Sequence, residues 1–251
     1  MKFYLLSALY VLIIALAILF PIERLETIII VSGVSIVFIA IIVWASVNIN
    51  SQFYVKTICR SNKKNMIAIT FDDGPDTKNT MQILDILDDY NAKATFFVIG
   101  EKAEENSGLV KLIHDSGHQV ANHSYSHSYF FPLKRSKTIR EEINSTQSII
   151  QKITGEKSFY FRPPFGVTNP LIAKALKGLN IKTIGWSIRS FDTVQKDAEK
   201  TITRIKKRIK GGDIILLHDT GGNIIPMLKK LLEIISHNSL IAVRVDELLK
   251  K

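Results

Sequence analysis

The sequence predicts an α/β protein whose parallel strands are preceded by two transmembrane helices. From residue 66 onward, short apolar strand candidates alternate with amphipathic helical patterns. Strict alternation of this kind favours parallel strands joined by helical crossovers. Before this region, two long stretches contain no charged residue. About seven strands in the remaining chain fit either a barrel or an open doubly wound sheet.

The first 50 residues are predicted to form a transmembrane hairpin, with helices at about 3–20 and 27–47. These stretches contain 18 and 21 residues, close to the ~20 that a helix needs to cross a bilayer. A buried helix of a soluble protein would carry a polar stripe, and neither stretch has one. A cleaved signal peptide is the alternative for the first stretch, but no small-residue cleavage site directly precedes Pro21.

A polar linker is expected at 51–64, followed by one domain at 65–251. The first 50 residues have balanced charges, so the formal net charge of +10 belongs entirely to 51–251. A basic domain beside a membrane suggests anionic lipid or an anionic polymer as a partner. Nucleic acid is not expected, because the sequence has no recognition motif for it. Cys59 is the only cysteine, which excludes an intramolecular disulfide and a multi-cysteine metal site.

Within the domain, the predicted strands and helices follow one another in order. Several helical patterns end at glycine, which is typical of helix carboxyl termini. The strand candidates are 66–71, 94–99, 119–122, 159–162, 183–187, 213–217 and 240–245, and the helix candidates are 80–90, 101–116, 136–154, 170–179, 198–209 and 224–236.

The first strand ends in two adjacent carboxylates, Asp72 and Asp73, before a Gly-Pro turn. Neighbouring residues of a strand point to opposite sides, so one carboxylate can bind a cation while the other stays free as a base. An Asp-rich turn that merely closes a strand is the simpler interpretation. Four further strand ends argue against it, because active sites of parallel α/β folds lie at the carboxyl ends of their strands. These ends carry His123 and His127, Arg162, Asp192, and His218.

His123 and His127 are four residues apart, so both imidazoles can face one cation if the segment turns helically. Together with Asp73 they form a candidate metal site that leaves positions open for water and substrate. Zn²⁺ is the first choice for two imidazoles and a carboxylate, and Co²⁺, Ni²⁺ or Mn²⁺ would also fit. Such a metal activates water, Asp72 could take the proton, and His218 could protonate a leaving group. This chemistry indicates hydrolysis of an amide or an ester.

The same strand ends resemble the successive motifs of the polysaccharide deacetylases, the NodB-homology carbohydrate esterases. The matching motifs are TFDDGP at 70–75, HSxxH at 123–127, RPPFG at 162–166 and LxH at 216–218. Their order and spacing match from about residue 65 to 249. The resemblance implies a distorted (β/α) barrel and metal-dependent removal of acetyl groups from N- or O-acetylated sugars.

The resemblance also implies a role for each site residue. Asp72 would be the base and His218 the acid, while the three candidate ligands keep the metal. Arg162 would tether Asp72, and Asp192 would orient His218. Two further positions complete the implied site: the backbone N–H of Phe165 would help to hold the oxyanion, and Leu216 would line the pocket for the acetyl methyl group.

Two positions depart from the family pattern. Many relatives carry Trp directly after the residue that matches Asp192, and this chain has Thr193. They often carry Asp where this chain has Arg189. Neither change removes a catalytic group, but both leave the identity of the sugar chain open.

We therefore expect a membrane-anchored, metal-dependent deacetylase of a cell-envelope polysaccharide such as peptidoglycan or an exopolysaccharide. A non-catalytic glycan-binding protein on the same fold is the alternative. It is disfavoured because the base, the acid and the three ligand positions are all filled. Counting Lys and Arg places both flanks of the hairpin in the cytoplasm, whereas the resemblance places the domain outside. Large domains translocate largely regardless of charge, so we expect the outward orientation.

Overall fold

A nine-stranded sheet of parallel strands forms the centre of the domain in the computed structural model, which describes residues 2–20, 23–194 and 197–250. The strand order is β1-β6-β5-β4-β3-β2-β8-β7, and β9 pairs with the amino-terminal half of β2. The curled, half-barrel shape of this sheet confirms the predicted parallel α/β fold of the barrel type. The strands are β1 (Thr57–Ile58), β2 (Met66–Gly74), β3 (Ala94–Val98), β4 (Gln119–Asn122), β5 (Tyr160–Phe161), β6 (Lys182–Ile184), β7 (Ile188–Arg189), β8 (Ile214–His218) and β9 (Ile241–Val243).

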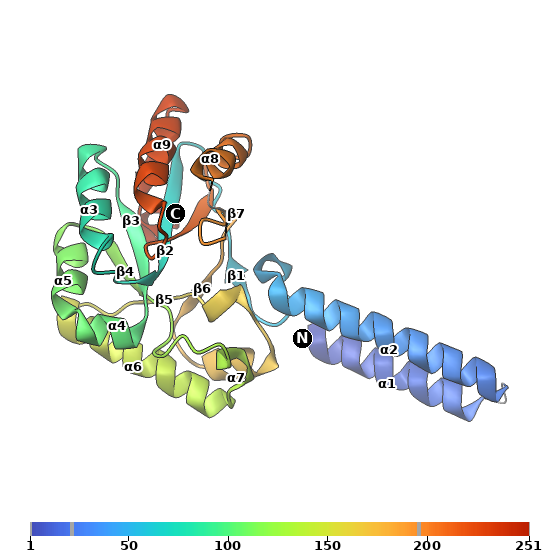
Figure 1. The fold of residues 1–251 in the computed structure, drawn as a ribbon. Coiled ribbons are helices and arrows are strands. Elements are labelled where there is room, and N and C mark those ends of the chain that lie inside the picture. Colours follow the sequence, from blue (N-terminus) through green and yellow to red (C-terminus); the bar gives the residue numbers. More distant parts are fainter. Residues whose placement is uncertain (1, 21–22, 195–196, 251) are drawn as a thin grey trace.

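Helices surround the sheet of the domain (Figure 1). Most follow the predicted pattern, but the helix expected at 101–116 is divided at Asn106, whose φ of −121° and ψ of 47° are not helical. The side chain of Asn106 donates a hydrogen bond to the carbonyl of Lys102, and such local bonds compete with a continuing helix. The helices of the domain are α3 (Thr80–Asp89), α4 (Gly100–Glu105), α5 (Ser107–Asp115), α6 (Ser136–Thr154), α7 (Pro170–Leu176), α8 (Ala198–Lys206), α9 (Ile224–His237) and α10 (Val245–Leu248), with 3₁₀ turns η1 (Ile49–Ser51), η2 (Phe131–Leu133) and η3 (Pro164–Gly166).

Strand β2 presents different residues to the two faces of the sheet. Ile69 and Phe71 are fully buried in the large apolar core, together with residues of α3 and α9 such as Ile83 and Leu231. Because side chains alternate along a strand, Thr70 points to the opposite, inner face. The inner face therefore carries polar groups toward the carboxyl end of β2, which is where the candidate site lies.

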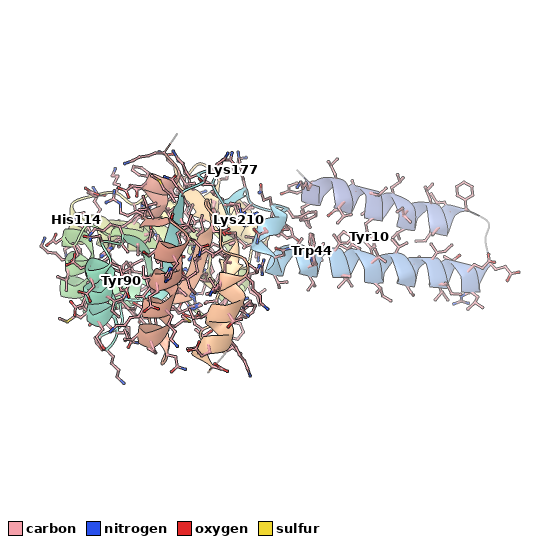
Figure 2. All side chains as sticks on the ribbon, turned by 90° about the horizontal axis from the view of Figure 1, so that it is seen from above. Tyr10, Trp44, Tyr90, His114, Lys177 and Lys210 are labelled. Carbon is pink, nitrogen blue, oxygen red and sulfur yellow. The ribbon has the colours of Figure 1, made fainter. Side chains whose placement is uncertain are left out.

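The two amino-terminal helices, α1 (Lys2–Leu19) and α2 (Arg24–Val47), form a hairpin that projects from the domain (Figure 1). By length and composition, both could cross a membrane. Tyr10 joins the helices: its ring stacks on Phe38 at 4.3 Å between centroids, and its hydroxyl lies 2.9 Å from Ser35 Oγ. Figure 2 shows Tyr10 between the helices and Trp44 at the end nearest the domain.

The segment expected to be a linker packs against the domain. Strand β1 lies within it and pairs with β6, with Thr57 opposite Thr183. Arg60 forms an ion pair with the buried Asp213. Two-residue strands such as β1 and β7 are too short to give a period in the sequence, which is why the sequence predicts about seven strands and the sheet has nine. The outer ends of the predicted domains, residues 1 and 251, lie outside the described residues, as do positions 21–22 between the two predicted helices.

Candidate metal centre and active site

The end of β2 brings both carboxylates to one imidazole. Asp72 Oδ2 lies 3.6 Å and Asp73 Oδ1 3.4 Å from Nε2 of His123. The pairing register with β3 shifts between Asp72 and Gly74, and Asp73 has a φ of 71°. A β-bulge of this kind inserts one residue and re-aims its side chain. The expectation that the two carboxylates point to opposite sides is therefore wrong, because it assumed a regular strand.

The loop after β4 places His123 and His127 with their ring centroids 4.8 Å apart. It does so without the expected helical turn, since Ser124 and His127 adopt left-handed backbone conformations with φ of 67° and 46°. Asn122 stabilises this turn, because its side-chain oxygen accepts a hydrogen bond from the Ser124 N–H at 2.9 Å. The two imidazoles thus face one another through a tight irregular loop.

Asp73, His123 and His127 have the arrangement of a metal site. Asp73 Oδ1 lies 3.3 Å from Nε2 of His127 and 3.4 Å from Nε2 of His123. This oxygen is buried and has no hydrogen-bond partner among the described residues. Nδ1 of His123 lies 2.8 Å from the carbonyl of Arg162, which can only accept, so the proton is on Nδ1 and Nε2 is free to bind a metal. The donor set of one carboxylate and two imidazoles fits a divalent transition metal.

The protonation states of this group favour metal binding. Burial would raise the pKa of Asp73, but the neighbouring His123 and His127 outweigh it and hold the pKa well below its usual range. Burial lowers the pKa of His127 to about 4, and nearby His123 adds to this effect. At neutral pH the group therefore offers an ionised carboxylate and a neutral imidazole, the forms that bind metals.

Arg162, at the end of β5, holds Asp72. The guanidinium is fully buried, and its Nη1 donates hydrogen bonds to Asp72 Oδ1 at 2.6 Å and to Thr70 Oγ1 at 2.8 Å. Its remaining N–H groups reach the carbonyls of Ile184 and Gly185. Charge-assisted bonds of this kind are short and strong. Oδ1 of Asp72 is thus engaged, while Oδ2 is the oxygen nearer to His123.

His218 and Asp192 form a second pair beside Asp72. His218 is the register partner of Asp72 on the neighbouring strand β8. Asp192 Oδ1 lies 2.8 Å from Nδ1 of His218, and Oδ2 accepts the His218 N–H at 2.7 Å. Burial would lower the pKa of His218, but the hydrogen bond that its imidazole donates to Asp192 outweighs this effect, so the pKa is raised. The pair is suited to keep a protonated imidazole whose Nε2 remains available to a substrate.

The last two predicted residues lie at the same end of the sheet. Phe165 has a φ of 59°, and its ring lies 4.8 Å from that of His127. Tyr129 stacks on Phe165 at 5.7 Å and is almost fully exposed. Leu216 is buried on β8, opposite Thr70 and two residues before His218. The structure therefore brings all the predicted site residues to one end of the sheet, and their individual roles remain predictions.

Residues that support the site were missed in the sequence. Glu142 of α6 is buried and accepts hydrogen bonds from the N–H and the hydroxyl of Ser126, which lies in the loop at 123–127 that carries both histidines, here named the histidine loop. Lys134 forms an ion pair with the same carboxylate. Lys102 donates a hydrogen bond at 2.7 Å to the carbonyl of Asp73, at the bulge. Glu142 could have been noticed, since it lies on the apolar face of α6, next to Ile143.

A curled parallel sheet that carries an Asp–His–His group and a His–Asp pair at its strand ends defines a hydrolase of the β/α-barrel class. The family model for polysaccharide deacetylase matches residues 60–184. A peptidoglycan-N-acetylglucosamine deacetylase of Bacillus cereus is 36% identical over 194 residues, which cover 75% of this chain and 90% of that protein. The chain therefore belongs to the polysaccharide deacetylase family, as expected, and is a hydrolase of the class that acts on carbon–nitrogen bonds other than peptide bonds.

Solved structures agree with this assignment and add a contrast. The peptidoglycan deacetylase PdaC from Bacillus subtilis is 30% identical, with a TM-score of 0.69 over 74% of this chain and 90% of that one. A CE4 family pseudoenzyme from Bacillus anthracis is 27% identical, with a TM-score of 0.72 over 78% and 69%. The fold thus occurs both in an active deacetylase and in a pseudoenzyme. Whether a chain with this fold is catalytic therefore depends on its site residues. The chain covers 63% and 42% of two other similar deacetylases, so those proteins contain further segments.

Proposed function

We infer that this protein is a membrane-anchored, metal-dependent deacetylase of an N-acetylated cell-envelope glycan, with peptidoglycan as the first candidate. One observation carries this proposal: Asp72 lies between a metal-type Asp–His–His group and a preformed His–Asp pair. The sugar stays open, because similar proteins include deacetylases of both N-acetylglucosamine and N-acetylmuramic acid. O-acetyl groups are the alternative target.

The mechanism begins with water activation. Asp73, His123 and His127 would hold the metal, which when bound polarises the acetyl carbonyl and makes water more acidic. Asp72 accepts a proton from the attacking water, and its ion pair with Arg162 holds the carboxylate in position. The new carbon–oxygen bond forms at the acetyl carbon.

The second half of the reaction uses the other side of the site. The backbone N–H of Phe165 donates to the oxygen that becomes negative. His218 donates a proton to the leaving nitrogen, and Asp192 stabilises the imidazolium before that transfer. The carbon–nitrogen bond then breaks and yields acetate and a free amine. Leu216 would contact the acetyl methyl group.

Acetate release tests this function directly. The full chain in detergent, loaded with Zn²⁺, is incubated with peptidoglycan, with N-acetylglucosamine oligomers and with an acetylated exopolysaccharide. We expect acetate from at least one glycan and about 10²-fold less, or none, from a sample that carries Asp72→Asn. Glycan binding without acetate release would favour a non-catalytic binding protein and overturn the proposal.

The proposed location is the cell membrane, with the domain outside. Cys59 is a poor reporter of this orientation, because it is buried and burial raises the pKa of its thiol. Lys177 is exposed on the domain (Figure 2), so Lys177→Cys in a Cys59→Ala background gives a better one. Labelling of intact cells by a membrane-impermeant thiol reagent supports the outward orientation. Labelling only after lysis contradicts it.

A further inference from the structure

The end of α2 and the turn after it contact two segments that carry site residues, the loop after β5 and the residues after β6. The Thr168 N–H donates a hydrogen bond at 2.9 Å to the carbonyl of Ser46, which lies within α2. Thr168 is three residues after Phe165, the proposed oxyanion donor. A side-chain carbon at Gly185 would lie 3.2 Å from Ile49 of η1, two residues after α2, and the Gly185 carbonyl accepts a hydrogen bond from Arg162. The candidate membrane helix is therefore joined to the site itself.

The junction between the hairpin and the domain is braced at several points. Phe3 of α1 contacts Tyr54, with ring centroids 5.5 Å apart. The Tyr54 hydroxyl donates to the carbonyl of Ile42, and Ser51 Oγ donates to the carbonyl of Ala45. Both helices are thus fixed to the segment that leads into β1. A domain held in this way cannot swing outward as it could on a flexible tether.

The same contacts define how far the site lies from a membrane. A helix of 24 residues such as α2 extends about 36 Å, slightly more than the ~30 Å hydrocarbon core. Its end near the domain carries the exposed Trp44 (Figure 2), and the rings of Phe3 from α1 and Tyr54 lie together at the junction. Aromatic rings of this kind prefer the membrane–water interface. Three residues span at most about 11 Å, so Phe165 lies close to head-group level.

The next step toward the site is His127, whose ring centroid lies 4.8 Å from that of Phe165. Together these steps place the site within about 20 Å of the end of α2, and therefore near the head groups when α2 spans the membrane. The formal charge of +10 on 51–251 also attracts the domain to anionic lipids and keeps it near them. A rigidly held site at this height reaches a glycan next to the membrane and does not reach a polymer held far from it.

We propose that the substrate is a glycan still anchored in the membrane through a lipid, deacetylated while it lies at the membrane surface. This inference rests on the proposed deacetylase activity and on α1 and α2 lying in the membrane. The chemical class is a lipid-linked, N-acetylated oligosaccharide or nascent strand. The upstream reaction must therefore be one that assembles N-acetylated sugars on a lipid carrier.

A tether series in vesicles tests the inference. The full chain, loaded with Zn²⁺, is placed in vesicles of phosphatidylethanolamine and phosphatidylglycerol. The probe is a tetramer of N-acetylglucosamine, supplied free, coupled directly to a lipid, or coupled through a long flexible polymer. Deacetylation is followed by mass spectrometry, with Asp72→Asn vesicles as the blank. We expect the directly coupled tetramer to react at least as fast as the polymer-coupled one, because a shorter tether raises the effective concentration.

The outcomes separate this inference from the function on which it rests. If the free and polymer-coupled tetramers react and the directly coupled one is at least about tenfold slower, the site stands away from the membrane and the inference is overturned. The deacetylase function would survive that result. If none of the three probes loses acetate, the proposed function fails for this glycan and the inference fails with it.

Discussion

On one side of Asp72, a buried carboxylate oxygen of Asp73 has no hydrogen-bond partner among the described residues, although two imidazole nitrogens lie within 3.4 Å of it. On the other side, both oxygens of Asp192 are engaged with His218, and Ser190 Oγ donates a further bond at 2.6 Å. Both sides of the site thus combine an aspartate with histidine. They differ in that the oxygens of Asp192 have hydrogen-bond partners and the buried oxygen of Asp73 has none among the described residues.

This difference indicates which side of the site would take the proposed metal. A buried polar atom without a hydrogen bond is costly in a folded protein, and here it lies beside two imidazole nitrogens, which supports the proposed metal on this side. The His218–Asp192 pair is complete without one. We therefore expect the metal side to respond to metal and ligand changes, and the acid side to respond to pH.

Removing the metal ligands should give the largest effect. His123→Ala combined with His127→Ala leaves one carboxylate, which cannot hold the ion, and activity should fall about 10³-fold or more because several kcal/mol of stabilisation are lost. Elemental analysis and acetate release measure the two losses. His237→Ala, on an exposed helix position, is the control and should keep both. One ion per chain in the double variant would mean that the metal site is misassigned.

The residue between the two sides should separate binding from turnover. Asp72→Asn is nearly isosteric but cannot accept a proton at neutral pH, so turnover should fall about 10²-fold or more. The metal content should stay unchanged, because the three ligands remain. Asp88→Asn, an exposed position on α3, serves as the matched control. Normal turnover by Asp72→Asn would exclude Asp72 as the base.

Loss of Glu142, which supports the histidine loop, should lower metal affinity less than loss of the ligands themselves. Glu142→Gln weakens the bonds to Ser126 and the ion pair with Lys134, so the loop that carries His127 should loosen. We expect metal affinity to fall about 10- to 100-fold, as for other groups that orient metal ligands. Titration with Zn²⁺ and a competing chelator measures this. Glu141→Gln, at the exposed neighbouring position, should leave the affinity unchanged.

On the acid side, the expected change is in the pH dependence of the rate. His218 must be protonated to act, so activity is lost as pH rises through its pKa, and Asp192 raises that pKa. Asp192→Asn should therefore move the alkaline limb of the pH–rate profile to lower pH. At pH values above both pKa values, the rate should fall about tenfold for every pH unit by which the limb moves. A limb that does not move would separate Asp192 from the titration of His218.

The smallest effect should come from a change in the packing of Gly185 against Cys59, next to the site. A methyl group at Gly185 would meet Cys59 Sγ at 2.4 Å, so Gly185→Ala should lower the free energy of unfolding by about 1–3 kcal/mol. Gly108→Ala has no neighbour within 4 Å and should be neutral or slightly stabilising. Thermal unfolding in detergent compares the two. Equal melting temperatures would show that the junction tolerates movement.

Local sequence pattern alone determined many of the helices of this protein and the position of its site. The helix at 136–154 has the predicted bounds, because its apolar residues recur with the helical period and Gly155 ends it. The two uncharged stretches became α1 and α2, and the motif residues at the strand ends meet because carboxyl ends of parallel strands share one edge. Each of these features depends on residues close together in the chain, or on the direction of the strands.

Only the tertiary structure decided the geometry inside the site and at the junction. The bulge at Asp73 depends on the register between β2 and β3, and the burial of Glu142 depends on how α6 packs over the histidine loop. The contact from Ser46 to Thr168 joins segments more than 100 residues apart. Such features are set by contacts distant in the chain, which compete with local preference and leave no period in the sequence.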